Sequence, residues 1–417
     1  MNSALAALVG LVFSIILIIR KVAPVYSLIL GAVLSGILSG WGLELTVEHM
    51  VSGVKDITPA ILRILTAGVL SGVLIRTGAG ASIARTIVDK LGRKQIYMAL
   101  AISAFVLTAI GVFIDVAVIT IAPVALMVGS RLKVGREKLL LALIAGGKCG
   151  NIISPNPNTL IAAENFSSPL PSVMAAGILP ALIGLVFTAL VLMPMAPKGK
   201  ILESSEGEME GSEDKLPSFL RSIAGPVVTI LLLALRPLFG IVIDPLLALP
   251  IGGLVGLLVM GKKGCTMDSL RLGLEKMAPI AVLLVGTGTI AGVIKASAMK
   301  DILVDTLGGF QGGGSLMAVL SGALMSAATA STTAGATIAS ASFSDAILLS
   351  GVAGVWAAAM VNAGATILDH LPHGSFFHTT GGSMGLTVRD RLRLIPYECL
   401  IGAVLALSAM LCASLFQ

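Results

Sequence analysis

The chain has 417 residues, of which 56% are hydrophobic and 12% charged, and its mean hydropathy is +1.00. This composition excludes an ordinary soluble protein and is typical of a polytopic membrane protein. The net charge of +6 fits basic cytoplasmic loops rather than nucleic-acid binding. The four cysteines are widely spaced and show no metal or disulfide pattern, so we expect no metal site.

Apolar segments long enough to span a bilayer recur along the chain. They lie near residues 2–20, 23–42, 59–76, 173–195, 218–235, 240–260, 277–295 and 394–415. Arg20 and Lys21 follow the first segment with no small-residue cleavage site, which predicts a membrane helix rather than a signal peptide. The segments 95–130, 138–165, 312–349 and 350–378 are apolar but interrupted by polar residues.

Basic residues indicate the orientation of these segments, because Lys and Arg concentrate in cytoplasmic loops. If the basic segments at 20–21, 76–94, 131–138, 262–263 and 389–393 are all cytoplasmic, the N-terminus lies outside. Segment 95–130 must then leave and return on the same side, as a re-entrant hairpin with its tip near Asp115. Segment 312–349 is expected to enter from the opposite side, with TASTTAGAT (329–337) at its tip.

The two halves of the chain follow the same order of elements. VDKLG (88–92) recurs as VDTLG (304–308), and Pro155 and Pro372 occupy matching places in the two interrupted helices. Inverted repeats with discontinuous helices are typical of transporters. We therefore expect an all-α polytopic protein with two inverted repeats, each holding a re-entrant hairpin and a broken transmembrane helix.

The expected domains follow from this repeat. They are N-terminal scaffold helices (1–58), a first repeat (59–197; hairpin 95–130, broken helix 138–165), an acidic cytoplasmic linker (198–217), further scaffold helices (218–276) and a second repeat (277–417; hairpin 312–349, broken helix 350–378). The hairpins and broken helices would form an elevator-type transport domain that moves against the scaffold.

Four polar interruptions should converge under this symmetry: Asp115, NIISPNPNT (151–159), TASTTAGAT and LDHLPHGS (368–375). Broken helices expose N–H groups that bind anions, and side-chain amides and hydroxyls add donors. The predicted substrate-binding residues are Asn151, Ser154, Asn156, Asn158, Thr159, Ser331, Thr332, Thr333, His373 and Ser375. Such a site suits a small hydroxylated carboxylate.

Ionisable residues in these interruptions are candidates for ion coupling, because intramembrane charges are costly. We assign this role to Asp115, Asp369 and His370, although Asp115 could instead cap a helix. Lys148 could attract a carboxylate or extend its ammonium to the membrane surface. No phosphate-binding loop, HEXXH motif or nucleophile–His–acid set is present, so we expect neither an enzyme nor a cofactor.

Four motifs resemble segments of the gluconate permease family, within the ion transporter superfamily. They are VFIDVAVITIAPVAL (112–126), GNIISPNPNT (150–159), GATILDHLPHGSFF (364–377) and GLTVRDRLRLIPYE (385–398). By position, Asp115 matches an acidic family residue and His370 a family histidine. Asn156 and Ser154 replace a family histidine and proline, and His373 stands where the family has Asp.

The resemblance implies proton-coupled uptake of gluconate or a related sugar acid by a homodimer with an elevator-like movement. We expect a secondary active transporter in the cell inner (plasma) membrane, with a small organic anion, H⁺ (or Na⁺) and the lipid bilayer as partners and no nucleic acid. A cation/proton antiporter or Na⁺-coupled carboxylate transporter is the alternative, and an intramembrane enzyme or sensor a third.

Overall fold

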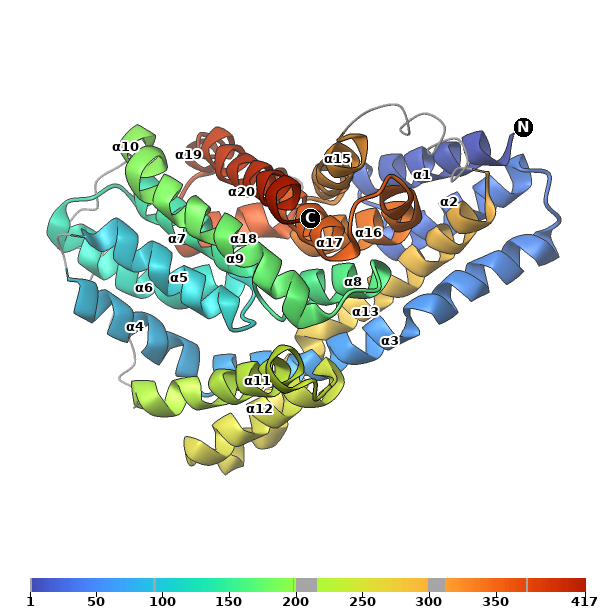
Figure 1. Ribbon diagram of the computed structural model, residues 1–417. Coiled ribbons are helices and arrows are strands. Elements are labelled where there is room, and N and C mark those ends of the chain that lie inside the picture. The colour runs from blue at the N-terminus through green and yellow to red at the C-terminus, as the bar shows by residue number, and fades with distance from the viewer. Residues whose placement is uncertain (1, 93–94, 198, 200–215, 299–311, 373) are drawn as a thin grey trace.

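The computed structural model describes residues 2–92, 95–197, 199, 216–298, 312–372 and 374–417 (Figure 1). Within these ranges the structure is all-helical. The helices are α1 (Ser3–Ile19), α2 (Pro24–Leu38), α3 (Leu43–Arg76), α4 (Ala79–Leu91), α5 (Ile96–Ala109), α6 (Ile114–Leu132), α7 (Arg136–Asn151), α8 (Pro157–Asn165), α9 (Leu170–Phe187) with η2 (Thr188–Leu192) and α10 (Met193–Met195), α11 (Phe219–Phe239), α12 (Pro245–Val259), η3 (Lys263–Cys265), α13 (Thr266–Ala296), α15 (Gly313–Thr329), α16 (Thr332–Leu349), α17 (Gly354–Gly364), α18 (Ser375–Ser383), α19 (Val388–Leu392) and α20 (Ile395–Phe416).

Five helical segments of the described chain are long and apolar enough to cross a membrane. They are Leu43–Arg76, Leu170–Met195, Phe219–Arg236, Lys263–Ala296 and Val388–Phe416. Their outer faces expose large apolar side chains such as Leu190 and Leu220, which are 71% and 75% exposed. A surface of this kind is stable only against lipid or another apolar surface. The prediction of a helical membrane protein is therefore confirmed.

The long helices α3 and α13 pack side by side at the centre of the fold (Figure 1). Their backbones touch through glycines: a Cβ on Gly53 would lie 2.1 Å from the Gly288 carbonyl oxygen, and one on Gly273 would lie 2.1 Å from that of Gly68. Since residue numbers fall along α13 as they rise along α3, the two helices are antiparallel. The small residues allow this close approach, as in many membrane helix pairs.

Both helices begin before the apolar spans that the sequence predicts, α3 at Leu43 and α13 at Thr266. Their first turns contain charged residues, so a hydropathy criterion leaves these turns out of the membrane span. The helical hydrogen bonds of the backbone nevertheless continue through them. The segment 76–94, read from the sequence only as basic, contains the helix α4. The repeated VDTLG motif at 304–308, and the linker residues 198 and 200–215, lie outside the described residues.

Short helices pack on both ends of this central pair. Gly286 of α13 lies against Val25 of α2, and Gly253 of α12 lies against Leu70 of α3. Helix α1 packs on α2, and α11 packs on α12. These elements leave one side of the pair to the remaining helices, α4–α9 and α15–α20.

The remaining helices contain two helix pairs with short turns and two interrupted helices. Residues 110–113 join α5 to α6, and Ala330 with Ser331 joins α15 to α16. Helix α7 is separated from α8 by residues 152–156, and α17 from α18 by residues 365–374. Each turn pair packs on an interrupted helix, α5 on α7 and α15 on α17. Helices α8 and α16 in turn pack on the central pair.

We predict that Gly273→Val destabilises the protein, because its side chain would overlap the α3 backbone. Overpacking of this kind costs about 1–3 kcal/mol. The measurement is the thermal unfolding midpoint of the purified protein in detergent, which should fall by several degrees. Gly264→Val is the matched control, because a Cβ at Gly264 meets nothing within 4 Å. Equal midpoints for the two variants would refute the close contact.

Candidate functional site

A polar cavity of about 470 Å³ lies where the helix turns and helix interruptions meet. We call it the tip cavity. It is lined by Phe113, Ile114, Asp115, Asn151, Asn158, Glu275, Lys276, Pro279, Ile280, Ala330, Ser331, Thr332, Thr333, Asp369, Ser375 and Phe376. Its volume lies in the range of small-molecule binding sites. The structure thus brings together residues of all four polar interruptions that the sequence singles out.

Four helices direct their N-terminal turns at the tip cavity: α6, α8, α16 and α18. Asn156 caps α8 by accepting from the Thr159 N–H, and Ser331 caps α16 by accepting from the Ala334 N–H. Helices α6 and α18 have no side-chain cap, because Phe113 and Gly374 precede them. Unpaired N–H groups and helix dipoles therefore favour a negative charge in this cavity.

The interruption between α7 and α8 is held by amide hydrogen bonds. The Asn156 amide donates to the Asn151 carbonyl oxygen at 3.0 Å, and the Asn362 amide donates to the Thr159 hydroxyl at 3.1 Å. Asn156, Thr159 and Ser154 are buried and do not line the cavity, so they shape the break from behind. Asn362 was not singled out from the sequence, since one Asn in an apolar helix is not a distinctive pattern.

Some polar atoms of this break have no hydrogen-bond partner within the described chain. They are the Asn151 amide nitrogen, the Ser154 hydroxyl and the Asn362 amide oxygen, and all three are buried. An unpaired buried polar group costs about 1–3 kcal/mol. Asn151 lines the tip cavity, and its unpaired amide nitrogen is itself buried.

The two hairpin and break systems contact each other at the cavity wall. The Thr333 hydroxyl of α16 donates to the Asn158 amide oxygen of α8 at 2.6 Å. The Thr332 hydroxyl donates to the Asp369 carboxylate, also at 2.6 Å. Ser375 lies exposed at the start of α18, and His373 lies outside the described residues. His378 is exposed, with its ring near the Pro372 carbonyl oxygen.

Lys148 lies behind the cavity and is fully buried. Its ammonium donates to the Asp369 carboxylate at 2.8 Å, to the Thr366 carbonyl oxygen and to the Glu398 carbonyl oxygen at 3.2 Å. His370 Nδ1 lies 3.0 Å from the same ammonium. The side chain reaches neither the cavity wall nor a membrane surface, and the carboxylate that it attracts is one of the protein's own.

A second buried ion pair adjoins this cluster. The Arg391 guanidinium donates two hydrogen bonds to the Glu398 carboxylate, one of them at 3.0 Å. A Glu398 carboxylate oxygen lies 3.8 Å from His370 Nδ1. The charges of Lys148 and Arg391 therefore balance those of Asp369 and Glu398 when the His370 imidazole is neutral. Arg391 and Glu398 were not predicted, because their burial depends on α20 packing against α7 and α17.

Glu275 and Lys276 of α13 also line the tip cavity and were not predicted. They directly precede the apolar run, so they count as loop residues when a membrane span is found by hydropathy alone. In the structure α13 begins at Thr266, so both residues lie within this helix.

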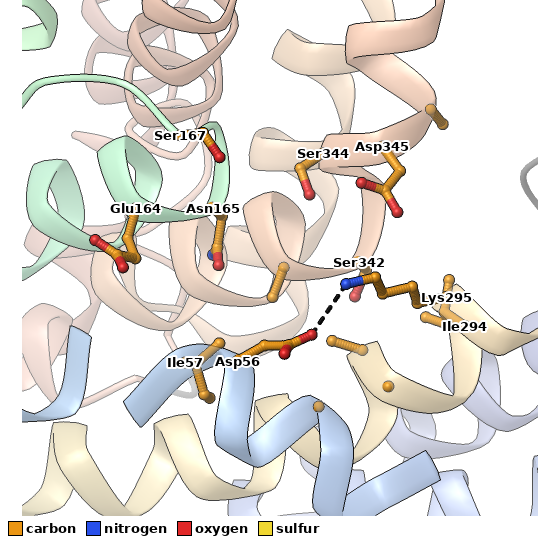
Figure 2. Close-up of a pocket in the computed structure, with 15 residues that line it drawn as sticks. Asp56, Ile57, Glu164, Asn165, Ser167, Ile294, Lys295, Ser342, Ser344 and Asp345 are labelled. Atoms are coloured by element: carbon orange, nitrogen blue, oxygen red, sulfur yellow. Dashed lines mark hydrogen bonds and ion pairs between the residues drawn. The ribbon is translucent and has the colours of Figure 1, made fainter. Parts of the chain in front are cut away.

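A second polar cavity, of about 350 Å³, lies between the other ends of the same helices (Figure 2). Its lining includes Asp56 of α3, Glu164 of α8, Lys295 of α13 and Asp345 of α16. Figure 2 shows the Asp56 carboxylate paired with the Lys295 ammonium, at 3.0 Å. Since α8 and α16 border both cavities, these two helices form the partition between them.

Arg63 of α3 joins this partition to the surrounding helices. It donates two hydrogen bonds to Asp244, the N-cap of α12, at 2.8 and 3.0 Å, and a third to Glu164 at the end of α8. The Arg63–Glu164 pair therefore bridges the central helices and the interrupted helix. This contact is only partly buried, so its contribution to stability is small.

Membrane-length apolar helices and interrupted helices around a polar cavity define a multi-pass membrane transporter. A family model described as GntP family permease matches residues 3–416. The chain belongs to this family of permeases, so it is a transporter and not an enzyme, and the resemblance read from the sequence is confirmed.

Individual relatives agree with this assignment. The chain is 48% identical over 415 residues to an uncharacterized transporter of Haemophilus influenzae, covering 100% of this chain and 99% of that protein. It is 29% identical to a gluconate permease of Pseudomonas aeruginosa, with 89% of each chain covered. It is 25% identical to the Gnt-II system L-idonate transporter of Escherichia coli, with 71% of each covered.

A solved structure shares the fold. The crystal structure of the Alcanivorax borkumensis YdaH transporter, described as having an unusual topology, matches with a TM-score of 0.62. The match covers 90% of this chain and 88% of that one at 15% sequence identity, so it supports the fold alone.

We predict that Lys148→Met destabilises the protein strongly, because it leaves the Asp369 carboxylate buried and unpaired. Breaking a buried pair costs about 3–5 kcal/mol. The thermal midpoint should fall sharply, and the double variant Lys148→Met/Asp369→Asn should recover part of the loss. If the double variant is no more stable than Lys148→Met, the pair is not the source of the effect.

Proposed function

We propose that this protein is a secondary active transporter that imports a gluconate-like sugar acid, coupled to protons, across the cell inner membrane. The observation that supports this most directly is the convergence of four helix N-termini on one hydroxyl- and amide-lined cavity. Relatives named as gluconate and L-idonate transporters support the same substrate class.

The substrate carboxylate would lie against the uncapped N-termini of α6 and α18, whose N–H groups have no side-chain partner. The Asn151 amide, Thr332, Thr333 and Ser375 would contact the hydroxyl groups of the sugar acid. A charged substrate without hydroxyls would make none of these contacts, and such mismatches are disfavoured.

Asp115 is the residue that we favour for coupling. It lies half-buried in the cavity wall, in the first turn of α6, and no hydrogen bond or ion pair within the described chain engages it. A bound carboxylate beside Asp115 would place two negative charges together, so a proton or Na⁺ must bind with it. Asp369 and His370 already belong to the balanced cluster around Lys148 and would act as secondary proton sites.

The repeat and the elevator movement are part of the same proposal. Glycines recur at one spacing in α3 and α13 (53 and 273, 68 and 288, 72 and 292), and their contacts are reciprocal, which supports inverted repeats. The central pair with α1, α2, α11 and α12 would be the fixed, dimeric scaffold. The hairpins α5–α6 and α15–α16 and the broken helices would carry the site between the tip cavity and the second cavity.

The membrane orientation follows from the basic residues. Arg76 at the end of α3, and Lys262 and Lys263 before α13, lie at the helix ends nearer to the tip cavity. Because basic loops are cytoplasmic, this cavity would open to the cytoplasm and the N-terminus would lie outside.

We predict that D-gluconate and L-idonate raise the thermal midpoint of the purified protein, because ligands stabilise the folded state by mass action. Sorbitol is the matched control, since it has the hydroxyl groups without the carboxylate. Stabilisation by Na⁺ or pH alone, with no effect of any sugar acid, would favour the cation/proton antiporter instead.

We predict that Asp115→Asn abolishes gluconate accumulation driven by a proton gradient in proteoliposomes but preserves gluconate exchange. A neutral amide can hold the substrate but cannot exchange a proton. Asp268→Asn is the control, because Asp268 pairs with Arg76 on an exposed surface outside both cavities. Normal accumulation and normal pH dependence in Asp115→Asn would remove this residue from the coupling mechanism.

A further inference from the structure

The tip cavity contains one cationic side chain among its lining residues, Lys276 of α13. The ammonium is exposed, and no hydrogen bond or ion pair within the described chain engages it. Lys148, the other lysine nearby, is fully buried, committed to Asp369, and absent from the lining. Lys276 is therefore available to a ligand, whereas Lys148 is not.

Lys276 and its neighbour Glu275 differ from the other polar groups of the cavity in the element that holds them. Asn158, Thr333 and Ser375 belong to the broken helices and the hairpin, which the proposed function treats as moving. Lys276 belongs to the central helix pair, where close glycine contacts fix α13 against α3. A movement of the hairpins would therefore separate the substrate from Lys276.

The matching position of α3 carries the opposite charge. GVKDITP (53–59) and GLEKMAP (273–279) align on their glycines and prolines, which places Asp56 opposite Lys276. Asp56 lines the second cavity, as Lys276 lines the tip cavity, and it is paired with Lys295 (Figure 2). Equivalent points of the central pair thus present the cation Lys276, beside Glu275, to one cavity and a carboxylate paired with Lys295 to the other.

We propose that Lys276 is a side-specific substrate contact, which binds the carboxylate of a sugar acid only while the site faces the tip cavity. This rests on the proposed function. The ammonium and the helix N-termini would then attract the anion together on the cytoplasmic side. Because Asp56 replaces Lys276 at the other cavity, the contact is absent when the site faces outward. Cytoplasmic sugar acid would consequently rebind and slow further import.

The test compares the two faces of the membrane with D-gluconate as the probe. Intact cells give the apparent KM at the outer face, and everted membrane vesicles give it at the cytoplasmic face. Lys276→Gln should raise the cytoplasmic KM by about twofold to fivefold, as expected for one exposed charge interaction. The outer KM should change by less than about twofold, and Lys276→Arg should resemble the wild type on both faces.

Arg271→Gln is the matched control, because Arg271 is an exposed cation of the same helix that does not line the cavity. Equal changes of KM on both faces for Lys276→Gln, or no change on either, would overturn the inference. If the wild type transports D-gluconate and Lys276→Gln has the same KM values as the wild type on both faces, only this inference fails. If the wild type does not transport D-gluconate at all, the proposed function itself fails.

A chemical modification experiment does not depend on how well the variant is expressed. It compares one cysteine variant carrying a positive group with the same variant carrying a negative group. Lys276→Cys in a Cys265→Ser, Cys399→Ser background would be modified from the cytoplasmic face with positive ethylammonium or negative ethylsulfonate methanethiosulfonate. The positive group should lower the cytoplasmic KM and the negative group should raise it. Identical KM values after both modifications would count against a charge contact at this position.

Discussion

The candidate site depends on the ammonium of Lys148, which joins the break after α17, where regular helical hydrogen bonding stops, to the helices α7 and α20. It comes from α7 and donates to the carbonyl oxygen of Thr366 and the carboxylate of Asp369, both in the break that follows α17, and to the carbonyl oxygen of Glu398 in α20. A helix interruption inside a membrane must find such partners within the protein. Through Thr332, Asp369 extends the same network to the turn between α15 and α16. One fixed charge therefore positions two of the helix ends that border the tip cavity.

A contrast between two kinds of packing runs through the molecule. The central pair α3–α13 is joined by backbone contacts between glycines, which leave little room for adjustment. Helices α8 and α16 pack on the pair between two polar cavities, and the partly exposed Arg63–Glu164 bridge joins α8 to α3. A fixed central pair, with a polar cavity on each side of the helices that pack on it, is compatible with a movement between two positions. The partition formed by α8 and α16, with a cavity on each side, supports the same interpretation.

Much of this organisation could be predicted from composition and from the positions of polar residues. The run at 329–337 indicates a turn because hydroxyl groups and small residues there replace an apolar surface, and the structure places the α15–α16 turn at Ala330 and Ser331. Prolines at 155 and 157 likewise mark the interruption before α8. Membership of the permease family and the helical membrane fold were predicted correctly from these patterns and their order.

The contacts behind the site could not be predicted, since they join residues that are distant along the chain. Lys148 and Asp369 face each other only because α7 and the α17 break pack together. The burial of Arg391 and Glu398 has the same origin. Lys276 was missed for a different reason: a hydropathy criterion ends a membrane helix at the first charges, although α13 continues through them. The functional roles of the site residues, Asp115 included, stay predictions.

The central claim is that the sugar acid binds to the helix N-termini that line the tip cavity, and not to the side chains that line the second cavity. The most direct measurement is equilibrium binding of radiolabelled D-gluconate to purified Thr333→Val and Ser342→Ala. Thr333 contacts Asn158 at the tip cavity, whereas Ser342 lines the second cavity with its hydroxyl unpaired in the described chain. The account predicts that Thr333→Val weakens binding by about tenfold, which corresponds to about 1.4 kcal/mol, and that Ser342→Ala leaves it unchanged. Wild-type affinity in Thr333→Val, with weakened binding in Ser342→Ala, would contradict it.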